Sequence, residues 1–331
     1  MLVAKITPCF ENGKIAQASV STKVAFGSTE FHVLRPIGNK IDRRYLLHFL
    51  RQPSVLQLGE QRMTGAGGQR RVPARLFDEL EIPLPPIEEQ RRIAAVLDAA
   101  DALRAKRRQA LAKLDTLTQA IFIDMFGGLG AQRWTSAATT MADLLAEPLR
   151  NGVSPAKSGK VEADVLTLSA ITGRAFDPSA VKRSTFTRSH SVSNTVSSED
   201  FLICRGNGNL SLVGRGRFPD KTESHIAFPD TMIAARCDQR RIGRQYLELL
   251  WNGPLVRRQL ESLARTTNGT YKINQTMIES VEIPLPPIEL QTKFDETMSA
   301  VSSLRSRMAK GQGHLDALFA SLQQRAFRGE L

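Results

Sequence analysis

Arginine and asparagine side chains gather in one glycine-rich segment of the sequence. Residues 205–217 read RGNGNLSLVGRGR. Arginine can form two hydrogen bonds with a guanine edge and asparagine two with an adenine edge, while glycine lets a backbone approach closely. The segment therefore has the chemistry for reading double-stranded DNA. We predict that five of its residues contact the DNA: Arg205, Asn207, Asn209, Arg215 and Arg217.

Two further segments carry a similar mixture of cations and amides. Residues 265–275 read RTTNGTYKINQ, and residues 150–160 read RNGVSPAKSGK. Lysine and arginine would bind phosphates, and the amides would read bases. Each segment alone could be a solvated polar loop, but three in one region favour a DNA interface. The predicted contacts from these segments are Lys157, Lys160, Arg265, Thr267, Asn268, Lys272 and Asn274.

No arrangement typical of catalysis accompanies these segments. A phosphate-binding Walker A loop needs GxxxxGK[ST], and the nearest match, Ser158-Gly159-Lys160, has Ser154 where the first glycine belongs. No Ser/His/Asp set stands out, and the five histidines and three cysteines lack metal-ligand spacing. We predict no catalytic residue, no metal and no cofactor.

The charge balance indicates an anionic partner. Lys and Arg number 45 against 33 Asp and Glu, which gives a net charge of +12. Such a balance is frequent in proteins that bind nucleic acid, although a basic face that docks an acidic protein would also explain it. No apolar run approaches the roughly 18 residues of a membrane span, and the N-terminus lacks the order of a signal peptide. Few, widely spaced cysteines suit a reducing compartment, so we predict a cytoplasmic protein without membrane contact.

A ten-residue string that occurs twice predicts an internal duplication. Residues 81–90 read EIPLPPIEEQ and residues 282–291 read EIPLPPIELQ, so nine positions match at an offset of 201. The second copy, 131–331, has 201 residues and the first, 1–130, has 130, which makes the first copy 71 residues shorter at its front. We expect an N-terminally truncated chain or a misassigned start. The same offset matches Tyr45-Leu46 with Tyr246-Leu247, Pro53 with Pro254 and Gly68 with Gly269.

Each copy ends in a pattern typical of a long helix. Prolines force an extended approach, carboxylates follow in the first turn, and Gly127-Gly128 and Gly329 provide stops. The predicted helices cover about 88–126 and 289–327. Apolar residues recur every seven positions, which predicts a two-helix coiled coil within the chain, with a homodimeric coiled coil as the alternative.

The heptad rows define the helix faces that we expect to be buried. In the first helix the rows are Ile93, Ala100, Arg107, Leu114, Ile121 and the companion row Val96, Leu103, Ala110, Leu117. In the second helix they are Phe294, Val301, Met308, Leu315, Leu322 and the companion row Thr297, Leu304, Gly311, Leu318. Interior glycines cost about 1 kcal/mol each relative to alanine. We therefore expect a kink or break at Gly311 and Gly313.

The regions before the two strings differ from the helices. They hold short apolar runs, at 165–171, 201–204, 225–228 and 232–235, separated by clusters of Gly, Asn, Ser and Pro. This pattern is typical of short strands and long loops. One amphipathic helix is predicted at about 243–263, with a counterpart at about 42–58. These regions are therefore predicted to be α+β domains.

Two such regions, each followed by the proline-rich string and a long helix, resemble the specificity subunit of type I restriction–modification systems. Segments GSTEFHVLRP at 27–36 and KIN at 272–274 add to the resemblance, which covers the whole chain. It implies an α+β fold with two target recognition domains, the first one partial, separated by a long antiparallel two-helix coiled coil. The implied domains are 1–80 (partial first recognition domain), 81–130 (first spacer helix), 131–280 (complete second recognition domain) and 281–331 (second spacer helix).

The resemblance also implies a role. Each recognition domain of such a subunit reads one half of a split DNA site, and the helices set the spacing between the halves. The subunit is non-catalytic, and its implied partners are double-stranded DNA, methyltransferase (modification) subunits and restriction/translocase subunits. The proline-rich strings and the two helices would bear the methyltransferase subunits. Two alternatives are a stand-alone DNA-binding remnant and a structural coiled-coil scaffold.

Overall fold

Two long helices begin where the proline-rich strings end. In the computed structural model, helix α4 spans Ile87–Phe126 and helix α10 spans Ile288–Arg328, so both predicted helices are confirmed. Glutamates lie in both first turns, where a carboxylate favours the positive end of the helix dipole. Gly127 and Gly329 follow with φ of 77° and 76°, a left-handed conformation that ends a helix at little cost for glycine.

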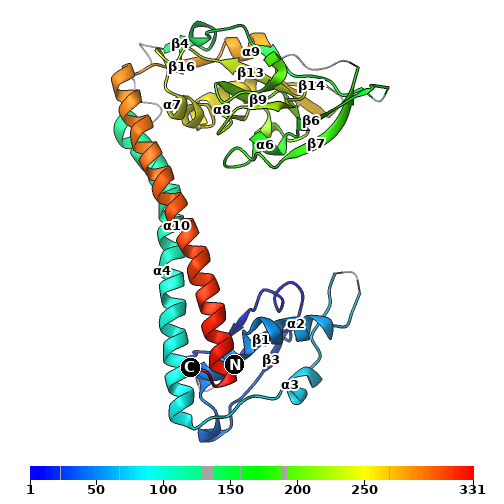
Figure 1. Cartoon of the computed structure of the whole chain (residues 1–331), viewed down its shortest axis with the longest axis vertical. Coiled ribbons are helices and arrows are strands. Elements are labelled where there is room, and N and C mark those ends of the chain that lie inside the picture. The colour runs from blue at the N-terminus through cyan, green and yellow to red at the C-terminus, as the bar shows by residue number, and fades with distance from the viewer. Residues whose placement is uncertain (23, 67, 128–137, 157, 188–191, 268) are drawn as a thin grey trace. The chain divides into compact units, whose positions relative to one another are not determined.

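The structure describes all residues except 23, 67, 128–137, 157, 188–191 and 268. They form two units (Figure 1). The first unit comprises Met1–Leu114 and Leu304–Leu331, and the second comprises Asp115–Ser303. Helices α4 and α10 contribute residues to both units.

The first unit is a small sheet with short helices. Its strands follow the order β2-β1-β3, and both pairs are antiparallel. The elements are β1 (Leu2–Ala4), β2 (Ile15–Ala16), β3 (Phe31–Val33), the 3₁₀ helix η1 (Gly38–Lys40), α1 (Arg43–Leu50), α2 (Pro53–Gln61) and α3 (Arg75–Glu79).

The second unit contains more strands, in sheets ordered β11-β9-β13-β5, β7-β6-β12-β8, β10-β15-β14 and β16-β4. Its first elements are β4 (Ala138–Thr140), η2 (Ala142–Leu144), β5 (Arg150–Asn151), β6 (Val161–Leu166), α6 (Ser169–Thr172), β7 (Val181–Phe186), η3 (Val192–Asn194), β8 (Thr195–Val196), β9 (Asp200–Cys204), β10 (Gly206–Asn207) and η4 (Leu210–Leu212). Those that follow are β11 (Gly216–Arg217), β12 (Glu223–Ala227), β13 (Met232–Arg236), α7 (Arg244–Trp251), α8 (Pro254–Leu263), β14 (Arg265–Thr267), β15 (Thr270–Lys272), α9 (Gln275–Glu279) and β16 (Glu282–Pro284). The apolar run at 165–171 is strand only in part, because α6 takes up its second half.

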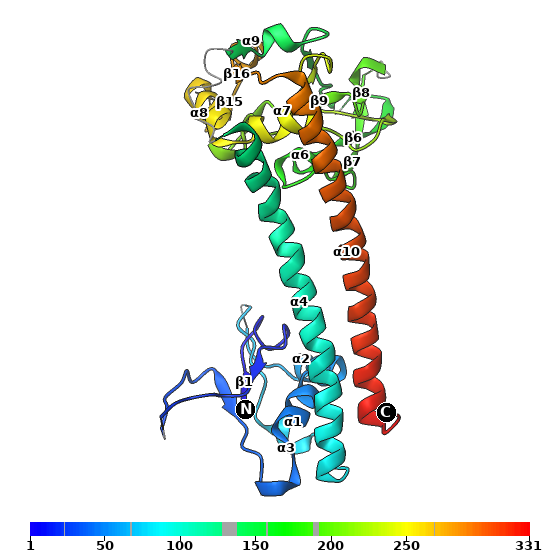
Figure 2. The same ribbon diagram turned by 90° about the vertical axis from the view of Figure 1, so that its left-hand side faces the viewer.

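The helices α4 and α10 pack against each other in antiparallel directions within each unit. In the first unit, Ile93 and Leu97 of α4 form a cluster with Leu322 and Ala326 of α10, and Figure 2 shows these ends side by side. In the second unit, the rings of Phe122 and Phe294 lie 5.6 Å apart. The chain thus supplies both helices of the pair, as predicted. The α+β class is confirmed as well.

The inward companion row of α4 differs from the prediction by one residue. Val96 and Leu103 are exposed, whereas Leu97 is buried and Arg104 is half-buried. The Arg104 guanidinium lies 4.3 Å from the centre of the Phe319 ring and donates to Asp316 at 2.6 Å. A heptad pattern allows a companion row at spacing three or four, and the partner helix selects spacing four here.

Helix α10 runs through Gly311 and Gly313 without interruption, so the predicted break is wrong. A Cβ atom at position 311 would lie 2.6 Å from Nη2 of Arg107. Arg107 donates to the Met308 carbonyl at 3.3 Å. Gly311 therefore makes room for the cation that interrupts the apolar row of α4.

The single helix predicted at 243–263 is two helices, α7 and α8, and its counterpart is likewise split into α1 and α2. Pro254 and Pro53 occupy the first turns of the second helices. Proline cannot continue a preceding helix but is well suited to start one. The split therefore follows from one residue in each copy.

Candidate nucleic-acid interface

Two of the predicted segments pair in one small sheet of the second unit. Strand β15 lies between β10 and β14, and both pairings are antiparallel. Lys272 is directly opposite Gly206 on one side and Arg265 on the other. The backbone thereby joins the segments 205–217 and 265–275, which are far apart in the sequence.

Arg265 and Lys272 form a pair of like charges on neighbouring strands. Residues directly opposite each other share a sheet face, and like charges at such positions repel. Both side chains are exposed, and neither forms an ion pair with any residue that the structure describes. Gly206, the third position of this row, has no side chain to cover them. The arrangement is unfavourable in the protein alone and favourable against a phosphate backbone.

The opposite face of the sheet carries uncharged polar groups. Asn207 pairs with Tyr271, and Tyr271 pairs with Thr266, so their side chains share the second face. The Oδ1 atom of Asn207 accepts a hydrogen bond from the Asn209 backbone N–H at 2.9 Å. This contact uses the amide oxygen of Asn207, so only its NH₂ group remains as a donor for another contact.

The third predicted segment, 150–160, is linked to Arg205 by Asp230, which contacts residues of both segments. Arg205 donates from Nη1 to the Asp230 carbonyl at 3.2 Å, and its own carbonyl accepts from Ile273 N at 2.9 Å. Ser154 donates to Oδ2 of Asp230 at 2.7 Å. Residues of all three predicted segments therefore meet around Arg205.

Arg217 lies in the interior, so its prediction as a DNA contact is wrong. Its side chain is 7% exposed. It donates to the Gly173 carbonyl at 2.9 Å and lies 3.5 Å from the Glu248 carboxylate. Burial lowers the pKa of Arg217 and raises that of Glu248. The guanidinium is committed to the fold and cannot reach a phosphate.

Two predicted asparagines have local structural tasks. Asn209 caps η4 by accepting from Ser211 N at 3.0 Å, and Asn274 caps α9 by accepting from Met277 N at 2.9 Å. Their oxygens are the acceptors that a bidentate contact with adenine would need. Each cap uses that acceptor, as the Asn209 backbone N–H uses that of Asn207, so all three asparagines keep only their NH₂ donors for a base edge.

The other predicted contacts lie at several places. Arg215 is half-buried and donates to the Ser211 carbonyl at 3.1 Å. Lys160 is exposed just before β6, in a different sheet from β10, β15 and β14. Thr267 pairs with Thr270 through the backbone. Lys157 and Asn268 lie outside the described residues.

The corresponding basic loop of the first unit, residues 62–71, is neutralised by carboxylates. Arg70 lies 3.2 Å from Glu11 and Arg71 lies 3.0 Å from Glu30, whose pKa is lowered by this hydrogen bond. Arg62 is paired with Glu79. The equivalent loops of the two units therefore differ in electrostatics, although both read as basic in the sequence.

A tyrosine and a glutamine hold each repeated string in place. Tyr45 and Tyr246 donate to the carbonyls of Pro83 and Pro284 at 3.0 and 2.7 Å. Burial raises the pKa of Tyr45 to about 12. The sequence alone predicted no such role for the string, although the matched tyrosines were a signal for it.

The glutamines Gln90 and Gln291 are buried in equivalent networks. Gln291 accepts from Gly243 N at 2.9 Å and donates to the Pro286 and Arg241 carbonyls at 2.8 and 3.3 Å. Gln90 makes the same three contacts in the first unit, with Asp42 N, Pro85 O and Lys40 O. Each network ties the start of a long helix to the loop that precedes α1 or α7.

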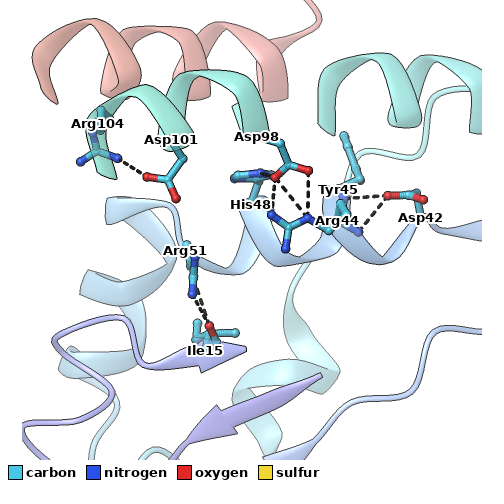
Figure 3. Close-up of polar contacts among 9 residues, drawn as sticks. All are labelled: Ile15, Asp42, Arg44, Tyr45, His48, Arg51, Asp98, Asp101 and Arg104. Carbon is cyan, nitrogen blue, oxygen red and sulfur yellow. Dashed lines mark hydrogen bonds and ion pairs between the residues drawn. The ribbon is translucent and has the colours of Figure 1, made fainter. Parts of the chain in front are cut away.

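The carboxylate that caps α1 or α7 comes from different elements in the two units. Asp42 accepts from the N–H groups of Arg44 and Tyr45, and Arg44 and His48 converge on Asp98 of α4 (Figure 3). In the second unit, Asp295 of α10 caps α7 by accepting from Tyr246 N at 3.2 Å. The position equivalent to Asp42 is Gly243, where a Cβ would lie 2.9 Å from Asp295.

The described residues contain no group of three or more metal-ligating side chains, and their cysteines are unpaired. No helix within the described part of the chain has the length and apolarity needed to cross a membrane.

Comparisons with known proteins agree with this geometry. A family model described as the type I restriction modification DNA specificity domain matches residues 4–114. The specificity subunit of type I restriction enzyme EcoKI from Escherichia coli K12 is 26% identical over 96% of this chain and 72% of its own length. That of EcoAI from Escherichia coli is 42% identical over 36% of this chain, but the match spans only 20% of the EcoAI subunit.

A solved chain shows that the fold is shared. It comes from work on the complex assembly and conformational transition of the type I R-M system, and it is 21% identical to this chain. The match covers 100% of this chain and 82% of that chain, with a TM-score of 0.63. The chain is thus similar to the specificity subunits of type I restriction–modification systems, and the family model matches its first third.

Proposed function

We propose that this chain recognises DNA sequence for a type I restriction–modification complex, through the sheet β10-β15-β14 of its second unit. The observation that carries the proposal is the exposed, directly opposed pair Arg265 and Lys272. An isolated protein gains nothing from two facing cations, whereas each can neutralise a DNA phosphate and release a counterion. On the other face, Asn207 and Tyr271 supply amide and hydroxyl groups suited to base edges.

The similarity to type I specificity subunits extends the proposal to the rest of the chain. Residues 131–280 would form a complete recognition domain and 1–80 a partial one, with 81–130 and 281–331 as spacer helices. The chain would be non-catalytic and act in the cytoplasm. Methylation and cleavage would come from modification and restriction/translocase subunits bound to it, and the second unit would read its own part of a two-part DNA site.

The exposed apolar residues of the long helices support a partner on this surface. Val96 and Leu103 of α4 and Leu304 and Leu318 of α10 are exposed in the first unit. Exposed apolar rows of this kind are typical of protein interfaces. A modification subunit is the partner that the family implies.

The proposal is tested by measuring DNA affinity as a function of salt. For the whole chain on a mixed-sequence duplex, log K should fall linearly with log salt concentration. Arg265→Ala and Lys272→Ala should each reduce that slope by about one unit. Arg240→Ala, which removes another exposed cation, one that is paired with Asp238, serves as the control. A slope near zero for the unmodified chain would indicate a scaffold rather than a DNA-binding protein.

A further inference from the structure

The sheet of the first unit corresponds to part of the central sheet of the second unit. Strands β2-β1-β3 and β11-β9-β13 have the same order and directions. Val3 is opposite Ile15 and His32, just as Ile203 is opposite Gly216 and Ile233. This register makes Leu2, Phe31 and Val33 the counterparts of Leu202, Met232 and Ala234.

One face of this sheet is covered in the second unit and open in the first. Leu202, Met232 and Ala234 are all 0% exposed, in a cluster with apolar residues of β6, α6 and β8. In the first unit Val33 is 51% exposed, and the described apolar clusters do not include Leu2, Phe31 or Val33. No described segment of residues 1–114 takes the place of 161–196.

The loop before β3 lacks a cover as well. Phe26 is 99% exposed, whereas Phe228, which precedes β13 in the second unit, is 0% exposed in the cluster with β6 and α6. Val20 and Val24 are exposed in the same loop. Large apolar side chains so placed have no function in a free loop and are typical of a surface that meets another polypeptide.

A cavity in the first unit matches a filled position in the second. Its volume is about 580 Å³, and its apolar lining includes Leu34, Ile41, Leu46, Leu50, Leu80 and Ile82. At the offset of 201, the counterparts are Ala235, Ile242, Leu247, Trp251, Val281 and Ile283. All six belong to one core cluster with Met141 and Leu144. Met141 N donates to the Val281 carbonyl at 2.9 Å, which puts this segment against the counterpart of Leu80.

The repeated string indicates independently that the first unit lacks a segment that the second unit has. Residues 282–284 form strand β16, whose partner is β4 (Ala138–Thr140). Residues 81–83 have the identical sequence EIP but form no strand. A strand needs a partner for its backbone hydrogen bonds, so identical residues differ here because only one copy has that partner.

We propose that this surface of the first unit binds a polypeptide segment of the kind formed by residues 138–199. The segment would extend along Glu81–Pro83, insert two apolar side chains into the cavity, as Met141 and Leu144 do, and cover the open sheet face with apolar residues like those of β6 and α6. The first unit is in this respect a protein-binding surface. The inference goes beyond DNA recognition, and its test involves no DNA.

The test adds a copy of residues 131–200 directly before Met1 of the whole chain. In the control, the added copy alone carries Met141→Asp and Leu144→Asp. Backbone amides of residues 80–82, 84 and 31–33 should exchange hydrogen at least about tenfold more slowly in the extended chain than in the unextended chain or the control. The fluorescence of an apolar-surface dye should fall in parallel. Unchanged exchange in the extended chain would overturn the proposal.

A second variant tests the proposal without depending on whether the control chain folds. Phe26→Ser should leave the unfolding midpoint of the unextended chain unchanged, since the ring is in water, and should lower it in the extended chain. Equal tolerance in both chains would contradict the proposal. Concentration-dependent protection of residues 80–82 and 84 in the unextended chain would also overturn it, because a second copy of the chain would then be the occupant.

Discussion

Arg265 and Lys272 illustrate how the energetic cost of two facing like charges in the free protein can indicate a candidate binding site. Like charges directly opposite on antiparallel strands destabilise the pair. Nothing in the described chain compensates them, whereas every arginine of the corresponding loop in the first unit has a carboxylate partner. This contrast is the reason why we propose phosphate binding for the second unit rather than for the first.

Reversing one of these charges should therefore change stability and binding in opposite directions. Lys272→Glu converts the repulsion into an attractive cross-strand pair, worth about 0.5 kcal/mol of unfolding free energy. DNA affinity should fall, because a cation is replaced by an anion. Denaturation followed by the fluorescence of buried Trp251 and a DNA titration measure the two effects. Unchanged DNA affinity would show that position 272 does not face DNA.

The predicted contact residues show which part of a site sequence alone can supply. Loop composition pointed to Asn207, Arg265 and Lys272, which the fold brings into one sheet, and to Arg205, which directly precedes that sheet. Composition could not exclude Arg217, because its burial depends on Glu248, which is distant in the sequence. Nor could it separate a base-reading asparagine from a helix cap such as Asn274, since both need an amide oxygen.

At the scale of elements, the joint between string and helix depends on one buried glutamine in each unit. Gln291→Leu would leave one N–H and two carbonyls without partners, and we expect a loss of about 2–4 kcal/mol in unfolding free energy. Denaturation followed by Trp251 fluorescence measures it. Gln245→Leu, on the exposed side of α7, is the matched control and should change stability little. A small effect of Gln291→Leu would mean that water replaces the lost contacts.

Helix α1 should respond to pH through His48. Burial lowers the pKa of His48, and Asp98, which partly opposes this effect, accepts its hydrogen bond. Arg44 and Asp101 also act on the ring. The unfolded imidazole binds a proton below about pH 6.5. The contribution of His48 to the stability of the first unit is therefore fully present above that pH and is lost as the pH falls towards and through the lowered pKa of the folded state.

Hydrogen exchange of the α1 amides at about pH 7.5 and 5.5, corrected for intrinsic exchange rates, measures this change in stability. The protection of α1 should decrease at the lower pH in the unmodified chain. His48→Gln, which does not titrate, should remove most of the difference. An equal difference in both chains would assign the pH dependence to other groups.

Local rules predicted the long helices well and their packing less well. Proline and glycine alone set the bounds of α4 and α10, because their effects depend on few neighbours. The predicted break at Gly311 is wrong. Arg107 of the other helix packs against this glycine, which has a packing role within a continuous helix. Contacts between distant segments decided both this point and the companion row of α4.

At the scale of the whole molecule, the two copies of the duplication differ in structure. The second unit has a covered sheet and the unpaired cations Arg265 and Lys272, whereas the first has a partly open sheet, and the arginines of its corresponding loop, 62–71, are paired with carboxylates. The chain should therefore read DNA mainly through its second unit. Counting residues between the two strings predicted the difference in length, but only the structure shows which contacts the shorter copy lacks.

The most direct test of sequence recognition is selection from a random duplex DNA library. The unmodified chain should enrich one defined block of adjacent bases, and the double variant Arg265→Ala, Lys272→Ala should retain little DNA of any sequence. Asn207→Ala should still bind DNA but enrich a different base at one position, where loss of a base contact is worth about 1–3 kcal/mol. No enrichment by the unmodified chain, or the same enriched sequence from Asn207→Ala, would contradict recognition through the β10-β15-β14 sheet.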